Sequence, residues 1–171
     1  MIEKQYLNTP EYIIRTFVSG NCRTVVPCSS ICEGDAYTLR FDTEKLIPCE
    51  NALTYDNAKL FSSHKKLAHM LIKLTEALYT FRSYCIPEEY ITPEKDKLFL
   101  DYGGGDLFLI PEYCEKEWID KLIDFCEDAE RLIPDTQGFV LSEKLKEEKA
   151  AGRTDMRRLQ ALLHSLEFNL S

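Results

Sequence analysis

Apolar residues recur every three or four positions along the longest periodic segment of the chain, which runs from Leu67 to Phe81. The members of the stripe are Leu67, Met70, Leu71, Leu74, Leu78 and Phe81. This spacing predicts one amphipathic helix, and Ser62 or Ser63 can cap its start. Because Ile72, Ala77 and Tyr79 widen the apolar surface, we expect this helix to pack on two sides and to form the centre of the fold.

The N-terminal third changes from a helical to a strand-like pattern. Thr9 and Pro10 are suited to begin a helix that Gly20-Asn21 can end. Its core-facing residues would be Tyr12, Ile13, Phe17 and Val18. The runs 23–28 and 36–41 are β-branched or aromatic and flank the turn residues 33–35, which predicts a hairpin. The run 45–49 is a candidate third strand that Pro48 confines to an edge, and residues 50–61 read as a loop.

The second half begins with a loop and a hairpin and then becomes helical. A strand is expected at 97–101, followed by a hairpin that ends at Pro111, and helices are expected at 118–129, 140–150 and 155–166. Trp118 lies on the apolar stripe of its helix, so we expect it in the core. Thr154 or Asp155 can cap the last helix, and residues 151–153 would join the last two helices as a helical hairpin.

These elements predict an α+β fold in which a small antiparallel sheet and an N-terminal helix pack on a mostly helical half. We expect a single domain, 1–171. Residues 1–61 would form the sheet-containing part, and residues 62–171 the helical part with the 97–110 hairpin. With 171 residues, 44% of them hydrophobic, the chain is long enough to bury a core.

Charge and composition narrow the classes of partner. The formal net charge of −8 argues against binding to nucleic acid, which depends on clustered Lys and Arg. The sequence has no window of about 20 apolar residues and no signal-peptide pattern. We therefore expect a cytoplasmic chain that does not itself insert into a membrane and that has protein partners.

Seven cysteines are scattered along the chain, which favours reduced thiols over a disulfide framework. Cys22, Cys28, Cys32 and Cys49 could form a metal or thiol sensor. Only one pair has the short spacing typical of structural zinc sites, so buried thiols are the favoured interpretation.

Glycines 103–105 lie between two strand-like segments rather than before a helix, which favours a hairpin turn over a phosphate-binding loop.

The segments 86–91, with sequence IPEEYI, and 98–103, with sequence LFLDYG, resemble in order and spacing the catalytic loop and the Asp-Phe-Gly strand of protein kinases. In this resemblance Tyr90 replaces the metal-binding asparagine and Cys85 falls at the position of the catalytic aspartate. Asp101 is the one residue still able to hold a metal ion or cofactor. A turn carboxylate is the alternative role for Asp101 and the favoured one.

A second resemblance covers nearly the whole chain and rests on apolar and turn positions. Its most distinctive segments are 12–18, 25–27, 37–42, 87–91 and 107–111. The pattern looks like an uncharacterised domain family of Gram-positive bacteria that usually precedes a membrane span and a forkhead-associated domain. That family is similar to the pseudokinase-like cytoplasmic part of the EssB/YukC subunit of type VII secretion. The resemblance implies a reduced kinase-like architecture in a membrane-associated signalling or secretion assembly.

Kinase-like order without kinase side chains predicts a non-enzymatic interaction or scaffold module with no catalytic residues, no cofactor and no metal. Two alternatives remain. One is a nucleotide-binding regulator that uses Asp101 and the lysines of helix 63–83 without phosphotransfer. The other is the cysteine-based sensor.

Overall fold

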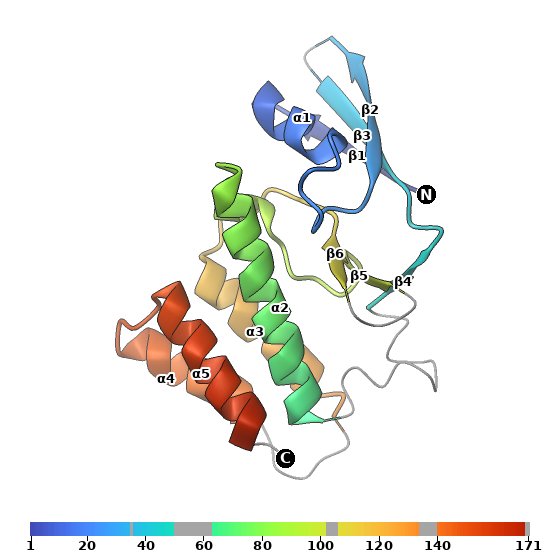
Figure 1. Cartoon of the computed structure of the whole chain (residues 1–171). Helices are drawn as coiled ribbons and strands as arrows, with labels where there is room; N and C mark the ends of the chain where they lie inside the picture. Colours follow the sequence, from blue (N-terminus) through green and yellow to red (C-terminus); the bar gives the residue numbers. More distant parts are fainter. Residues whose placement is uncertain (35, 50–62, 102–105, 134–139, 170–171) are drawn as a thin grey trace.

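The computed structural model describes residues 1–34, 36–49, 63–101, 106–133 and 140–169. In these ranges the strands are β1 (Ile2–Leu7), β2 (Cys28–Glu33), β3 (Ala36–Phe41), β4 (Leu46–Pro48), β5 (Leu98–Asp101) and β6 (Leu107–Leu109). The helices are α1 (Glu11–Val18), α2 (His64–Ser83), the 3₁₀ turn η2 (Glu88–Tyr90), α3 (Trp118–Glu130), α4 (Val140–Ala150) and α5 (Met156–Asn169). In Figure 1 the first sheet and α1 lie at the top, the second sheet lies below them on the right, and α2 to α5 fill the lower left.

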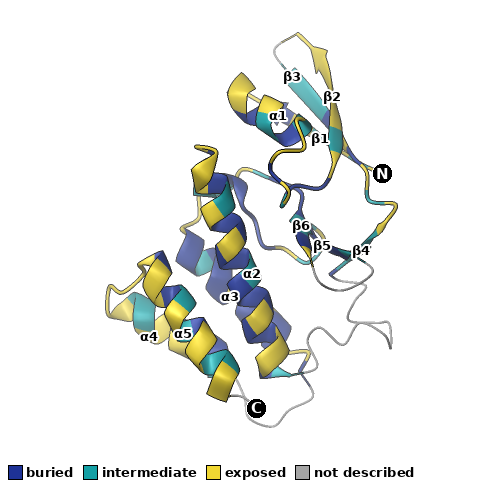
Figure 2. Cartoon of the chain, in the orientation of Figure 1, coloured by how far each residue is buried: buried dark blue, intermediate teal, exposed yellow. Residues whose placement is uncertain are grey.

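Helix α2 is the central element, as its apolar stripe predicts. Ser63 caps it, and the Ser63 Oγ accepts a hydrogen bond from the Lys66 amide at 3.3 Å. Leu67, Leu74 and Phe81 are fully buried, and α3 and α5 both contact α2. Figure 2 shows buried residues on α2 and α3 and many exposed residues on α4 and α5. The expectation that α2 packs on two sides is therefore confirmed.

The first sheet has the strand order β1-β3-β2, and both pairings are antiparallel. The predicted strand 36–41 is confirmed, but the strand predicted at 23–28 is wrong because β2 begins only at Cys28. The predicted turn 33–35 includes Asp35, which lies outside the described residues. Val25 instead forms an isolated parallel bridge with Leu109. The β-branched pair Val25-Val26 is buried where the two sheets meet, which explains its apolar character without a strand in the first sheet.

The second sheet has the order β4-β5-β6 and is also antiparallel. The predicted strand near 45–49 is present as β4, at a sheet edge as Pro48 requires. It pairs with β5, so a segment from the N-terminal third of the sequence is built into the sheet that follows α2. Residues 50–62 and 102–105 lie outside the described residues, so the loop and the turn expected there stay predictions.

Helix α1 corrects two details of the sequence-based expectation. Pro10 is the N-cap residue and no side chain caps the helix, so the cap expected from Thr9 is wrong. Tyr12 is 49% exposed rather than in the core, whereas Ile13, Ile14 and Phe17 are buried. The helix buries the face formed by these three residues, and Tyr12 lies outside that face with its hydroxyl donating to the Cys85 carbonyl at 3.1 Å.

The three C-terminal helices occur where the apolar periods predict them. Asp155 begins α5, and its carboxylate accepts from the Arg158 amide at 3.1 Å. The last two helices follow one another around Gly152, but α5 packs mainly along α2 and α4 along α3. Trp118 is buried, as its position on the stripe predicts. The α+β fold class is confirmed, and among the described residues no helix has the length and apolar character needed to cross a bilayer.

Candidate interaction site around residues 85 to 116

The loop that follows α2 is held by a complete helix-ending motif. The Cys85 amide donates to the Arg82 carbonyl and the Ile86 amide to the Phe81 carbonyl, both at 3.0 Å, which is the bonding pattern of a Schellman motif. Cys85 occupies the left-handed position of this motif, with φ of 56°. The residue that the kinase resemblance aligns with a catalytic base is thus a helix terminator.

Replacing Cys85 with glycine is expected to stabilise the protein by about 1 kcal/mol, because a Cβ is unfavourable in the left-handed conformation. The matched control is Ser83→Gly, in the last turn of α2, which should cost about 0.5–1 kcal/mol. Urea unfolding followed by circular dichroism measures both changes. Destabilisation by Cys85→Gly would contradict the conformational argument.

Tyr90 is part of the hydrophobic core and does not face a polar site. It is 6% exposed, and its ring lies 6.2 Å from that of Phe17 and 5.5 Å from that of Tyr113. Its hydroxyl donates to the Thr9 Oγ1 at 3.3 Å. The position that resembles the metal-binding asparagine of kinases therefore joins the loop to the segment before α1.

Asp101 closes the hairpin between β5 and β6. Its carboxylate accepts a hydrogen bond from the Asp106 amide at 3.1 Å, and its amide donates to the Asp106 carbonyl at 3.3 Å. The geometry matches the turn-carboxylate role. The nucleotide-binding alternative invokes the lysines of α2. Lys65 and Lys66 occupy exposed positions in its first turn, and Lys73 is half-buried further along the helix.

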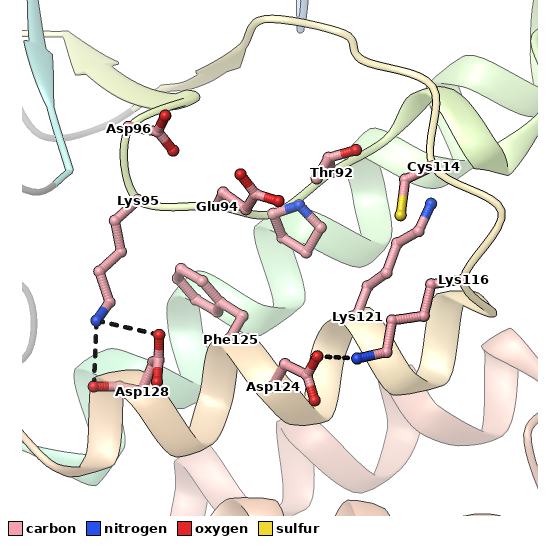
Figure 3. A pocket seen from close by; sticks show the side chains of 11 residues that line it. Thr92, Glu94, Lys95, Asp96, Cys114, Lys116, Lys121, Asp124, Phe125 and Asp128 are labelled. Carbon is pink, nitrogen blue, oxygen red and sulfur yellow. Dashed lines mark hydrogen bonds and ion pairs between the residues drawn. The ribbon is translucent and has the colours of Figure 1, made fainter.

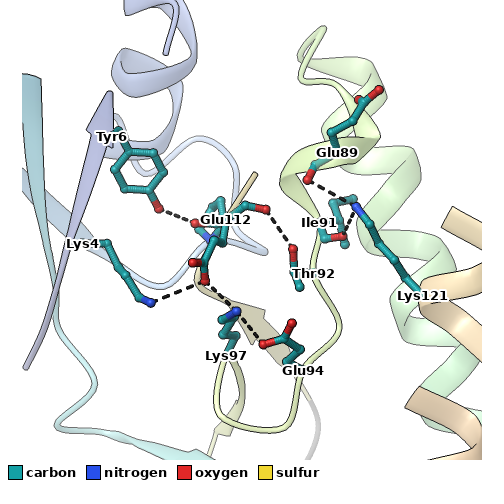
Figure 4. A network of polar contacts seen from close by, with 10 residues as sticks. Lys4, Tyr6, Glu89, Ile91, Thr92, Glu94, Lys97, Glu112 and Lys121 are labelled. Carbon is teal, nitrogen blue, oxygen red and sulfur yellow. Dashed lines mark hydrogen bonds and ion pairs between the residues drawn. The ribbon is translucent and has the colours of Figure 1, made fainter. Parts of the chain in front are cut away.

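A buried lysine on α3 holds the loop from the other side. Lys121 is only 4% exposed, and its ammonium group donates to the carbonyls of Glu88, Glu89 and Ile91 at 3.4, 3.3 and 3.2 Å. Burial lowers the pKa of Lys121. These three bonds satisfy carbonyl groups in and just after η2 and fix the loop against the helical half. Figure 4 shows the two bonds to Glu89 and Ile91.

Glu112 joins the loop region to the first sheet. Its carboxylate lies 2.6 Å from the Lys97 ammonium and 3.4 Å from that of Lys4, and Lys97 also pairs with Glu94 at 2.5 Å (Figure 4). Burial acts to raise the pKa of Glu112, but the hydrogen bond and charge of Lys97 outweigh it and lower the pKa. The Glu112 carbonyl accepts from the Thr92 hydroxyl at 2.8 Å.

A hollow of about 460 Å³ opens between the loop 92–96 and α3 (Figure 3). Pro93 and Phe125 supply apolar surface, and charged pairs close both ends: Lys95 with Asp128, and Lys116 with Asp124. Within each pair the positive charge of the lysine is neutralised by the negative charge of the aspartate. In the described ranges, no three His, Cys, Asp or Glu residues are placed to hold a metal ion.

The four cysteines of the proposed sensor do not form a cluster suited to a metal. Cys22 and Cys49 are buried, Cys28 is half-buried and Cys32 is exposed. Burial raises the pKa of Cys28 to about 11 and that of Cys49 to about 12. Both groups therefore carry their protons at neutral pH and are poor metal ligands and nucleophiles.

The polar residues that hold this site, Lys121 and Glu112, were not found from the sequence. Lys121 does carry a signal, because it falls between Trp118 and Phe125 at the three- and four-residue spacing of buried positions. A lysine at such a position indicates a buried ammonium that needs carbonyl or carboxylate partners. Glu112 follows Pro111 in a loop and carries no comparable signal.

Comparison with known proteins gives one informative likeness. The sequence matches no family model, and no curated protein gives a significant match. The fold is similar to the crystal structure of the Staphylococcus aureus EssB cytoplasmic fragment, with a TM-score of 0.55 and 12% sequence identity. The match covers 97% of this chain and 99% of the EssB fragment, so the likeness extends over the whole fold.

Proposed function

We propose that this chain is a non-catalytic, pseudokinase-like interaction module of a bacterial type VII secretion-like assembly. The observation that carries the proposal concerns the three positions that the kinase resemblance aligns with catalytic or metal-binding groups. Each of them has a structural role instead. Cys85 ends a helix, Tyr90 packs in the core and Asp101 closes a hairpin. The use of these three positions by the fold argues against phosphoryl transfer at this site.

The likeness to the EssB fragment supports the cellular setting of the proposal. It covers both chains almost completely, which argues for a shared architecture rather than a shared substructure. Acidic net charge is compatible with protein partners on the cytoplasmic side of such an assembly. Affinity capture from the producing bacterium should then enrich membrane components of the secretion machine. A capture that retains none of them would contradict the secretion setting.

Titration with ATP and Mg²⁺ tests the catalytic part of the proposal. We expect no ligand-dependent rise in melting temperature and no phosphate release, for the native chain and for Asp101→Ala alike. Robust stabilisation with turnover that Asp101→Ala abolishes would overturn the non-catalytic assignment. Stabilisation without turnover would instead favour the nucleotide-binding regulator. Asp106→Ala serves as the control, since Asp106 joins the same hairpin through its backbone.

A further inference from the structure

Strand β2 presents a complete open edge of the first sheet. It is the last strand in the order β1-β3-β2, and no strand in the described ranges pairs with its outer side. Residues 29–33 are exposed and Cys28 is half-buried. Ile31 is among the large apolar residues exposed at the surface, at 36%. Figure 1 shows β2 and β3 reaching away from the helical half.

The register of the hairpin determines which backbone groups of β2 face outward. The register runs from Glu33 opposite Ala36 to Cys28 opposite Phe41, and the next pair, Pro27–Asp42, is hydrogen-bonded, since the Asp42 amide donates to the Pro27 carbonyl at 2.8 Å. Antiparallel pairs then alternate, which turns Ile31 and Ser29 toward β3. The backbone N–H and C=O groups of Cys28, Ser30 and Cys32 therefore point to the open side.

This edge lacks the features that protect the sheet edges at β1 and β4. Exposed edges are usually blocked by charged side chains, proline or bulges. The opposite edge strand, β1, carries Glu3 and Lys4, and β4 contains Pro48. From Cys28 to Cys32 the strand β2 has no charge, no proline and an uninterrupted register.

We propose that β2 pairs antiparallel with β2 of a second copy of this chain, with Ser30 opposite Ser30. This register places Cys28 across from Cys32 and Ser29 across from Ile31, so that every facing pair is uncharged. Three outward-facing residues in each copy would then exchange about six backbone hydrogen bonds. The two sheets would become one continuous sheet across the two-fold axis.

A second copy suits this edge because the strand is complementary to itself, both in charge and in the spacing of its outward groups. Glu33 is the only charged residue of β2, and it lies beyond the last facing pair. Such a short strand buries less area than the roughly 1,200–2,000 Å² of stable complexes, so we expect a weak, concentration-dependent dimer. The net charge of −8 opposes self-association, and added salt should therefore strengthen it.

Analytical ultracentrifugation of the intact chain over a wide concentration range tests the pairing. We expect Ser30→Lys to abolish the dimer, because two ammonium groups would face each other at the axis. Gln5→Lys on β1 adds the same charge to the opposite edge and should leave the dimer unchanged. A chain that is monomeric at all concentrations, or equal losses in the two variants, would overturn the proposal.

Thiol cross-linking tests the register. In a background that carries serine at Cys32, Cys85 and Cys114, single substitutions Ser29→Cys, Ser30→Cys and Ile31→Cys are treated with a bimane reagent that bridges thiols a few ångströms apart. Facing Cβ atoms in such a pair lie about 5.5 Å apart. We expect the highest yield of cross-linked dimer for Ser30→Cys and none for the background alone. A maximum at Ile31→Cys, or equal yields at all three positions, would contradict the register.

Discussion

Replacing Glu130 with alanine is expected to lower the free energy of unfolding by about 3–5 kcal/mol, because it removes the acceptor for several buried donors at once. Glu130 is 6% exposed at the end of α3. Its carboxylate accepts from the amides of Leu141 and Ser142 at 2.6 and 3.3 Å and from the Ser142 hydroxyl at 2.5 Å. It thereby caps the first turn of α4, where a negative charge is favourable.

The same carboxylate also faces a buried histidine. The His64 Nε2 lies 3.6 Å from the Glu130 Oε1, and both side chains are almost fully buried. Through Glu130 the start of α2, the end of α3 and the start of α4 are therefore tied together. Removal of the carboxylate would release α4 and leave its first amides unpaired in an apolar setting.

Urea unfolding of Glu130→Ala and of the native chain measures the effect, with Glu127→Ala as the matched control on the same helix. Glu127 pairs with Lys146 at the surface, at 2.6 Å, so its loss should cost no more than about 1 kcal/mol. Equal effects of the two substitutions would show that Glu130 does not act as a buried cap. Because about 1 kcal/mol corresponds to roughly 2–4 °C in a chain of this size, a thermal melt should resolve the difference.

The second large effect is expected for Lys121→Met, which keeps the aliphatic stem and removes the ammonium group. The carbonyls of Glu88, Glu89 and Ile91 would lose a shared donor in a buried setting, at a cost of about 2–3 kcal/mol. The loss should be concentrated in the loop. Hydrogen exchange is expected to accelerate at the amides of Ile91 and Cys114, which donate to the carbonyls of Glu88 and Glu89.

Lys116→Met is the control for Lys121→Met. Lys116 forms an exposed ion pair with Asp124 across the same hollow, so its removal should change stability by less than about 1 kcal/mol. Exchange at Ile91 and Cys114 should stay at the native rate in this control. If Lys121→Met left both exchange and stability unchanged, the lysine would not be holding the loop.

The helices and most of the strands could be predicted from the sequence because their signals are local. The apolar stripe of α2, the serine before it and the aspartate before α5 each lie within a few residues of the element that they define. Strand β1 escaped prediction because its inward face carries Lys4 between Ile2 and Tyr6, which breaks the apolar alternation. The 23–28 run was wrongly predicted as a strand because its β-branched residues are buried between the two sheets, and burial favours such residues outside strands as well.

For the candidate site, too, the sequence predicted some features and the tertiary structure was needed for others. The order of the sequence placed Cys85, Tyr90 and Asp101 in one region and indicated that two of them lack catalytic side chains. The structural role of Cys85 emerged from its positive φ and the hydrogen bonds that end α2. Those of Tyr90 and Asp101 emerged from contacts with α1 and the segment before it and from the pairing of Asp101 with Asp106. The residues that hold the region together, Lys121 and Glu112, act on partners 15 to 108 positions away in the chain.

The sequence by itself determined the α+β class and the central position of α2, because these properties follow from side-chain identity and short-range period. Only the tertiary structure decided that β4 belongs to the sheet beyond α2, that Lys121 and Glu130 are buried, and that β2 is left as an open edge. Those outcomes depend on which segments, distant in the sequence, pack together and shield each other from water. A buried charge or an unpaired backbone group is recognisable only once its surroundings are folded.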